Sequence, residues 1–222
     1  QDWLPQCKAM VTVKLFHQIM IRLFFIINFC LISYISLANE EPSFSHTVAE
    51  MKSVEGNFSQ QVIDQRGSVM QEVGGNFLFK KPNLFKWNYI DPIQSQIISD
   101  GELLYLYDPD LKQVVISSLK KLGGVSPAML LVSSSASEHF IVKSIRATDH
   151  ISIYEAIPKN PQEASFSKVL IHFNQGLLSQ MHIIDNFNHK TKIYFDSIVN
   201  NRLINDAAFL FNVPEGVDVI KN

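Results

Sequence analysis

The sequence predicts a mainly β protein with a few short helices, built as one curled antiparallel sheet or an open barrel. Residues 74–117 alternate apolar and polar side chains with a period of two, which is typical of strands with one buried face. Turn signals separate these runs, above all Asp100-Gly101. No long helices alternate with the strands, as a parallel sheet would require, so we expect antiparallel pairing.

The stretch 74–117 is expected to form an antiparallel meander with large aromatic rings on one face. Phe77 and Phe79 alternate with polar neighbours, and Phe85, Trp87 and Tyr89 do the same after a turn at Pro82-Asn83. The next expected strands cover 96–99, 103–107 and 113–116. Such a face is either ordinary core beneath a helix or the lining of a cavity for an apolar ligand, and periodicity does not separate the two.

The segment before the meander predicts a helix over 43–55. Phe44, Val48 and Met51 fall at positions i, i+4 and i+7, and Ser43 or Ser45 can cap the first turn. Strands are expected over 58–64 and 69–73, the second running into the meander.

After the meander, Ser126 followed by Pro127 is the preferred opening of a helix, expected over 126–132. This short helix is apolar on nearly all sides and is either a core plug or a lid. Further strands are expected at 140–145, 151–157, 165–173, 177–184, 191–199 and 209–211.

The N-terminal region predicts export. Arg22 precedes an apolar run over 23–37, and Ser36-Leu37-Ala38 has the small-x-small pattern of a signal peptidase site. We therefore expect residues 1–19 to be an upstream extension of no assigned role, 20–38 a signal peptide and 39–222 one domain. The alternative is an uncleaved membrane anchor, although the run is shorter than the roughly 20 residues that span a bilayer.

Sequence motifs for catalysis, metal or cofactors do not stand out. The formal net charge of −2 gives no basic field for nucleic acid. Both cysteines, Cys7 and Cys30, precede the expected cleavage site, and no nucleophile elbow or Walker loop is present. His172 and His182 flank the expected hairpin at Gly176 and could pair across strands, but a metal needs three or four ligands. We expect no enzyme activity, no cofactor and no metal.

Several motifs together resemble the LolA family of periplasmic lipoprotein carriers. The matching segments are Phe58-Ser59-Gln60, Pro82-Asn83-Leu84-Phe85-Lys86-Trp87, Ile98-Ser99-Asp100-Gly101, Tyr105-x-Tyr107-Asp108-Pro109, Ser126-Pro127-Ala128-Met129 and Phe209-x-Phe211-x-x-Pro214-x-Gly216-Val217. The resemblance implies an incomplete antiparallel β-barrel closed by an α-helical lid. It also implies a periplasmic location and an apolar cavity for the acyl chains of triacylated lipoproteins.

The resemblance also implies particular residues and partners. The expected acyl-chain-binding residues are Phe77, Phe79, Phe85, Trp87, Leu104, Leu106, Met129 and Leu130. The implied partners are the inner-membrane ABC transporter LolCDE as donor and the outer-membrane receptor LolB as acceptor, with the carrier as a monomer.

The chain departs from the family pattern at Lys81. The family usually has Arg directly before the Pro, where it is thought to hold the lid through hydrogen bonds to helix backbone. Lysine keeps the charge but lacks the planar guanidinium with its five donors. We expect Lys81 to control the lid by binding the last carbonyls of the 127–132 helix.

Three related readings remain open. An acceptor such as LolB should carry a lipid-modified Cys, which this chain does not place after its cleavage site. A sensing module with the same fold would be a second class, and an enzyme acting on lipid a third.

Overall fold

The computed structural model describes residues 43–119, 127–133 and 136–222, all of which belong to one compact unit, Glu41–Asn222. The expected upstream extension, the signal peptide and the helix-capping Ser126 lie outside the described residues. The domain boundary at 39 therefore stays a prediction.

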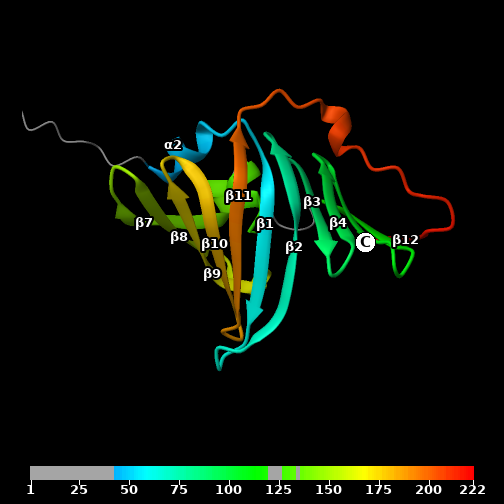
Figure 1. The fold of residues 1–222 in the computed structure, drawn as a ribbon, viewed down its shortest axis with the longest axis horizontal. Coiled ribbons are helices and arrows are strands. Elements are labelled where there is room, and N and C mark those ends of the chain that lie inside the picture. The colour runs from blue at the N-terminus through cyan, green and yellow to red at the C-terminus, as the bar shows by residue number, and fades with distance from the viewer. Residues whose placement is uncertain (1–42, 120–126, 134–135) are drawn as a thin grey trace, which may run out of the picture. The chain divides into compact units, whose positions relative to one another are not determined.

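Twelve strands of the described residues form one sheet (Figure 1). They are β1 (Ser53–Ile63), β2 (Val69–Lys80), β3 (Leu84–Asp91), β4 (Ser95–Asp100), β5 (Leu103–Asp108), β6 (Gln113–Ser118), β7 (Phe140–Ala147), β8 (Ile151–Pro158), β9 (Phe166–Asn174), β10 (Leu177–Asp185), β11 (Lys190–Asn200) and β12 (Asp218–Lys221). Their order across the sheet is β12-β6-β5-β4-β3-β2-β1-β11-β10-β9-β8-β7. The sheet curls without closing, since its edge strands β7 and β12 are not neighbours in this order. The predicted fold class is confirmed.

Short helices accompany the sheet. They are α2 (Phe44–Ala49), α3 (Met129–Val132), α4 (Ala136–His139) and the 3₁₀ turns η2 (Pro161–Glu163) and η3 (Asp206–Phe209). The Ser43 side chain caps α2 by accepting a hydrogen bond from the His46 amide at 3.2 Å. That capping assignment matches one of the two alternatives left by the sequence.

The N-terminal helix is much shorter than predicted. It ends at Ala49, and β1 already begins at Ser53, which pairs with Lys80 of β2. The helical spacing correctly predicted that Val48 and Met51 are buried, with Met51 only 1% exposed. Met51 nevertheless lies beyond the end of the helix. Residues 53–55 pair with β2, and Val54 and Glu55 pair with β11 as well, so their backbone groups are used by the sheet and not by a helix.

The C-terminal segment also differs from the prediction. Residues 209–211 do not form a strand: η3 ends at Phe209, which is fully buried, and the chain continues without regular structure. It runs past the ends of β3 and β4 and reaches the sheet edge as β12 (Figure 1). There β12 pairs in parallel with β6, so the sheet is not wholly antiparallel.

The tight turns follow the sequence signals. Asn83 adopts φ of 61° between β2 and β3, and Gly101 adopts φ of 99° between β4 and β5. Gly75 is required for a different reason. A Cβ there would lie 1.8 Å from the carbonyl oxygen of Asn88, so only glycine lets β2 and β3 approach so closely.

The main core lies on the face of the sheet that carries the aromatic rings of the meander, here called the inner face. Phe58, Phe77 and Phe85 point into it from β1, β2 and β3, while Phe166 and Phe173 come from β9. All four residues of α3 are buried against this cluster. The opposite side of the sheet is here called the outer face.

Candidate functional site

The inner face contains a cavity of about 300 Å³ between the sheet and the segment 127–132, which includes α3. Its lining is mostly apolar and includes Phe77, Phe79, Phe85, Trp87, Tyr89, Ile97, Leu104, Leu106, Pro127, Ala128, Leu131, Val132, Met181, Ile183, Ile193 and Gln60. Strands β1 to β5 and β10 to β11 therefore all contribute, and the curl of the sheet brings them around one space. This volume is at the lower end of the range of ligand pockets.

Aromatic rings build one wall of the cavity. The ring of Trp87 lies 4.3 Å from that of Phe58 and 5.3 Å from that of Phe77, measured between centroids. Phe195 packs edge-on against Phe77 at 5.2 Å. Contacts of this kind fix the rings in place, so the wall is largely formed before any ligand enters.

The structure brings six of the eight predicted acyl-binding residues to the cavity. They are Phe77, Phe79, Phe85, Trp87, Leu104 and Leu106, all on the period-two face of the meander. Met129 and Leu130 are buried in the core instead and do not line the cavity. The helix presents Leu131 and Val132 to the cavity, because α3 turns its first two residues toward the core.

Sequence reasoning missed the lining residues from β1, β10 and β11. Gln60 shares the inner face with Phe58, so a period of two counted from Phe58 could have found it. The Tyr89 hydroxyl lies 3.5 Å from the Gln60 side-chain oxygen, and burial raises the pKa of Tyr89. These two side chains supply the main polar groups in an otherwise apolar space.

Helix α3 is attached to the turn between β2 and β3. The amide of Asn83 donates to the carbonyl of Val132, the last residue of α3, at 3.2 Å. The hydroxyl of Ser99, which is fully buried, donates to the carbonyl of Asn83 at 2.7 Å. This chain of contacts, here called the Asn83 clasp, connects the helix that covers the cavity to strands β3 and β4.

Lys81 does not make the contact that the resemblance suggested. Its ammonium donates to the carbonyl of Val48 in α2, and the carbonyl of Val132 is satisfied by the Asn83 amide instead. Burial lowers the pKa of Lys81 to about 8. The expected contact with the 127–132 helix is thus replaced by one with α2, because the turn directs the Asn83 backbone rather than the lysine toward α3.

The two histidines singled out by the sequence do meet. Their ring centroids are 4.9 Å apart, on the outer face of β9 and β10. They are diagonal neighbours, since His172 pairs with Gln180 and His182 with Leu170. Burial, followed by the nearby His172 and Lys192, lowers the pKa of His182 to about 4. Within the part of the chain that the structure describes, no group of three or more potential metal ligands occurs.

Comparison with known proteins identifies strong similarity over most of the chain. The family model described as outer membrane lipoprotein carrier protein LolA matches residues 49–212. The outer-membrane lipoprotein carrier protein of Methylobacillus flagellatus is 36% identical over 169 residues, which cover 76% of this chain and 82% of that protein. The protein of the same name from Nitrosomonas europaea is 34% identical over 207 residues, covering 91% of this chain and all of the relative.

Among solved structures, an uncharacterised conserved protein from Thermus thermophilus shares the fold. It aligns with a TM-score of 0.51 over 81% of this chain and 95% of its own, at 8% sequence identity. At that identity the likeness concerns the fold alone.

Proposed function

Because the chain belongs to the family of LolA outer-membrane lipoprotein carrier proteins, we propose that it carries lipoproteins through the periplasm by enclosing their acyl chains. The observation that supports this most directly is the inner-face cavity, whose wall of Phe77, Phe85 and Trp87 is apolar and formed in advance. Exposing an acyl chain to water costs about 0.8 kcal/mol per methylene group. A carrier must therefore shield the chain until it is delivered.

We infer that the cavity in this structure is that of a closed carrier. Its volume of about 300 Å³ calls for enlargement before several acyl chains enter. Helix α3 has four residues, too few to be stable without its tertiary contacts. We therefore infer that α3 is a lid, released from the sheet when the Asn83 clasp opens and returned to it when cargo leaves.

The proposed route starts at the inner membrane and ends at the outer membrane. The sequence contains no nucleotide-binding motif, so energy for loading must come from a donor, for which we propose the ABC transporter LolCDE. The proposed acceptor is LolB. Among the described residues no helix is long and apolar enough to cross a bilayer. We propose a periplasmic location for the chain after cleavage behind Ala38.

Mass spectrometry of the protein purified from a periplasmic extract tests this function. We expect triacylated lipoproteins to co-purify in a one-to-one complex. Leu106→Asp, at a cavity-lining side chain that is 40% exposed, should be folded by circular dichroism and should carry much less lipoprotein. Purification of the wild-type protein without any acylated cargo, from cells that overproduce a lipoprotein, would argue against a carrier.

A further inference from the structure

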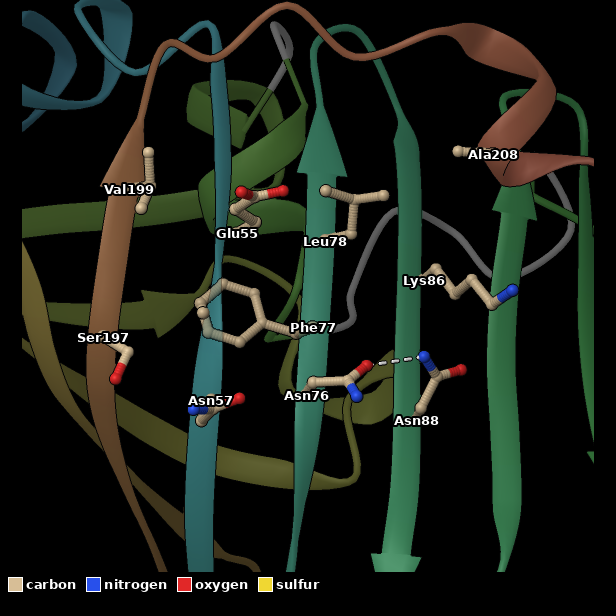
Figure 2. Close-up of a pocket in the computed structure, with 11 residues that line it drawn as sticks. Glu55, Asn57, Asn76, Phe77, Leu78, Lys86, Asn88, Ser197, Val199 and Ala208 are labelled. Carbon is tan, nitrogen blue, oxygen red and sulfur yellow. Dashed lines mark hydrogen bonds between the residues drawn. The ribbon is translucent and has the colours of Figure 1, made fainter.

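A row of polar side chains crosses the outer face of the sheet, away from the cavity. Direct strand pairing joins Asp196 to Asn57, Asn57 to Asn76 and Asn76 to Asn88. The same row continues to Gln96 of β4 and Tyr107 of β5. Paired residues lie on the same face, so five neighbouring strands from β11 to β4 present one unbroken line of carboxylate and carboxamide groups. This line is here called the amide row, and Figure 2 shows its three asparagines.

The amide row runs along the floor of two adjoining hollows. One, of about 570 Å³, is drawn in Figure 2 and has an apolar ledge of Leu78, Val199 and Ala208. The other, of about 390 Å³, continues toward Gln96. Asn76 and Asn88 line both hollows, so together they form one groove across the strands.

The groove offers hydrogen-bonding groups that the protein does not use itself. The Asn88 side-chain amide donates to Asn76 Oδ1 at 2.7 Å, which leaves the Asn76 amide and Asn88 Oδ1. Asn88 Oδ1 is enclosed and has no hydrogen-bond partner among the described residues. The pair thus leaves one donor, the Asn76 amide, open to the groove, and one acceptor, Asn88 Oδ1, that a ligand reaches when the Asn88 side chain turns toward the groove.

The charges around the groove favour a neutral ligand. Glu55 is held by an ion pair with Arg202. Lys86, which lines the larger hollow, and Asp196, which accepts hydrogen bonds from Asn57 and Ser197, contribute one charge of each sign. An adjacent donor and acceptor complement the C=O and N–H of a peptide group. An oligosaccharide would instead favour an open aromatic face, and the ring of Tyr107 is already covered by Phe211 at 5.3 Å.

We propose that the groove binds an extended polypeptide segment through its main chain, and that this segment belongs to the protein part of the lipoprotein cargo. The second half of this statement rests on the proposed carrier function. The amide row would hold the main-chain groups, and the ledge of Leu78 and Val199 would take small apolar side chains.

The spacing of the amide row suits an extended chain of polyproline-II geometry. Neighbouring strands are about 4.8 Å apart, so alternate strands are separated by roughly 9.6 Å. A polyproline-II chain repeats every three residues, or about 9.3 Å, and leaves its backbone groups without internal hydrogen bonds. Every third peptide group therefore meets every second carboxamide, for example Asn57 and then Asn88. Flexible linkers with Ser, Ala and Pro adopt this conformation readily.

Lipopeptides of two lengths test the proposal. One probe is a diacylated cysteine followed by two residues, and the other continues with three Ser-Pro-Ala repeats. For the wild-type protein we expect the long probe to bind with a Kd about three- to tenfold lower than the short one, as expected for one or two net hydrogen bonds. Asn76→Asp keeps the acceptor for Asn88 but removes the free donor, and it should abolish this difference without changing the Kd of the short probe.

Ser59→Ala provides the matched control, since Ser59 is exposed on the outer face of the same sheet outside the groove. It should retain the full advantage of the long probe. Equal binding of both probes by the wild-type protein would overturn the proposal that the groove binds polypeptide, while leaving the carrier function intact. Retention of the long probe's advantage by Asn76→Asp would overturn the groove as well.

The acyl-free peptide, acetylated and amidated at its ends, separates failure of the groove from failure of the carrier function. At millimolar concentration it should shift the side-chain amide resonances of Asn57 and Asn76 in ¹⁵N spectra. If neither lipopeptide binds, the proposed carrier function is wrong. The groove is then judged by the resonance shift alone: a shift supports it, and no shift overturns it. A shift caused by an N-acetylglucosamine oligomer and not by the peptide would overturn the proposal in favour of a saccharide.

Discussion

Lys81 places its ammonium group at the carbonyl end of α2, next to the turn that contacts α3. Its ammonium donates to Val48 and is partly buried, which lowers the pKa of the side chain. Two residues later, Asn83 satisfies the last carbonyl of α3. Lys81 can therefore influence the lid through the turn between β2 and β3, and its control of the lid stays a prediction.

We predict that Lys81→Leu loads normally but releases cargo to the acceptor several-fold more slowly. The substitution removes a hydrogen bond of about 1 kcal/mol from the closed form, and return to the closed form favours release. Transfer of a labelled lipoprotein from loaded carrier to LolB measures the effect. Lys52→Leu removes an exposed lysine nearby and serves as the control. Equal transfer by Lys81→Leu and wild type would show that Lys81 has no part in closure.

His182 is predicted to make the stability of the protein depend on pH. Burial lowers its pKa to about 4 in the folded state, below the ordinary value of 6.5. Between these values the unfolded state binds more protons, so stability should fall as the pH drops from about 6.5 toward 4. Thermal unfolding across this range measures the slope. His182→Gln should flatten it, and an unchanged slope in this variant would assign the effect to other groups.

At the scale of elements, the turn between β2 and β3 does more than reverse the chain. Asn83 holds α3 through its amide and is itself held by Ser99. Its φ of 61° lies in the left-handed region, where asparagine and glycine are tolerated better than other residues. The attachment of α3 to the sheet thus depends on the conformation of one turn residue.

A pair of substitutions at Asn83 tests this dependence. Asn83→Ala should lower the free energy of unfolding by about 1 kcal/mol, since alanine is strained at positive φ, and Asn83→Gly should be close to neutral. Urea unfolding provides the measurement. The Ala variant should also take up a hydrophobic probe more readily, because the lid contact weakens. If Ala proves as stable as Gly, the turn is not under the constraint described here.

On the scale of the whole molecule, the curl of the sheet is what creates the cavity. Residues from β2 and β3 line it together with residues from β10 and β11, although they are about 100 positions apart in sequence. Because the sheet has open edges at β7 and β12, we expect its curvature to change more easily than that of a closed barrel. A carrier that must admit and release cargo benefits from such a sheet.

The aromatic wall should be measurable as a binding surface. A hydrophobic fluorescent probe is expected to bind the purified protein, change the emission of Trp87 and be displaced by a lipopeptide. Phe85→Ala should weaken probe binding several-fold in a folded protein. Phe187→Ala removes a ring that is 72% exposed on a hairpin outside the cavity and should have no effect. Identical binding by wild type and Phe85→Ala would mean that these rings are ordinary core.

The sequence by itself determined the class of the fold and half of the cavity. Alternation with a period of two put Phe77, Phe79, Phe85 and Trp87 on one face, because neighbouring side chains of a strand point to opposite sides. The turns at Asn83 and Gly101 could also be predicted from the sequence, since few residues tolerate positive φ. Local physics decides these features, so local sequence reveals them.

Only the tertiary structure decided the other half. Met181, Ile183 and Ile193 reach the cavity through the curl of twelve strands, a property of the whole sheet that no single run encodes. The same holds for the early end of α2, which yields to pairing with β2 and β11, and for β12, which finds its partner β6 about 100 residues away. The amide row is spread over separate strands of β1 to β4 and β11, and it becomes visible only when their register is known, because direct cross-strand neighbours are set by pairing and not by proximity in the chain.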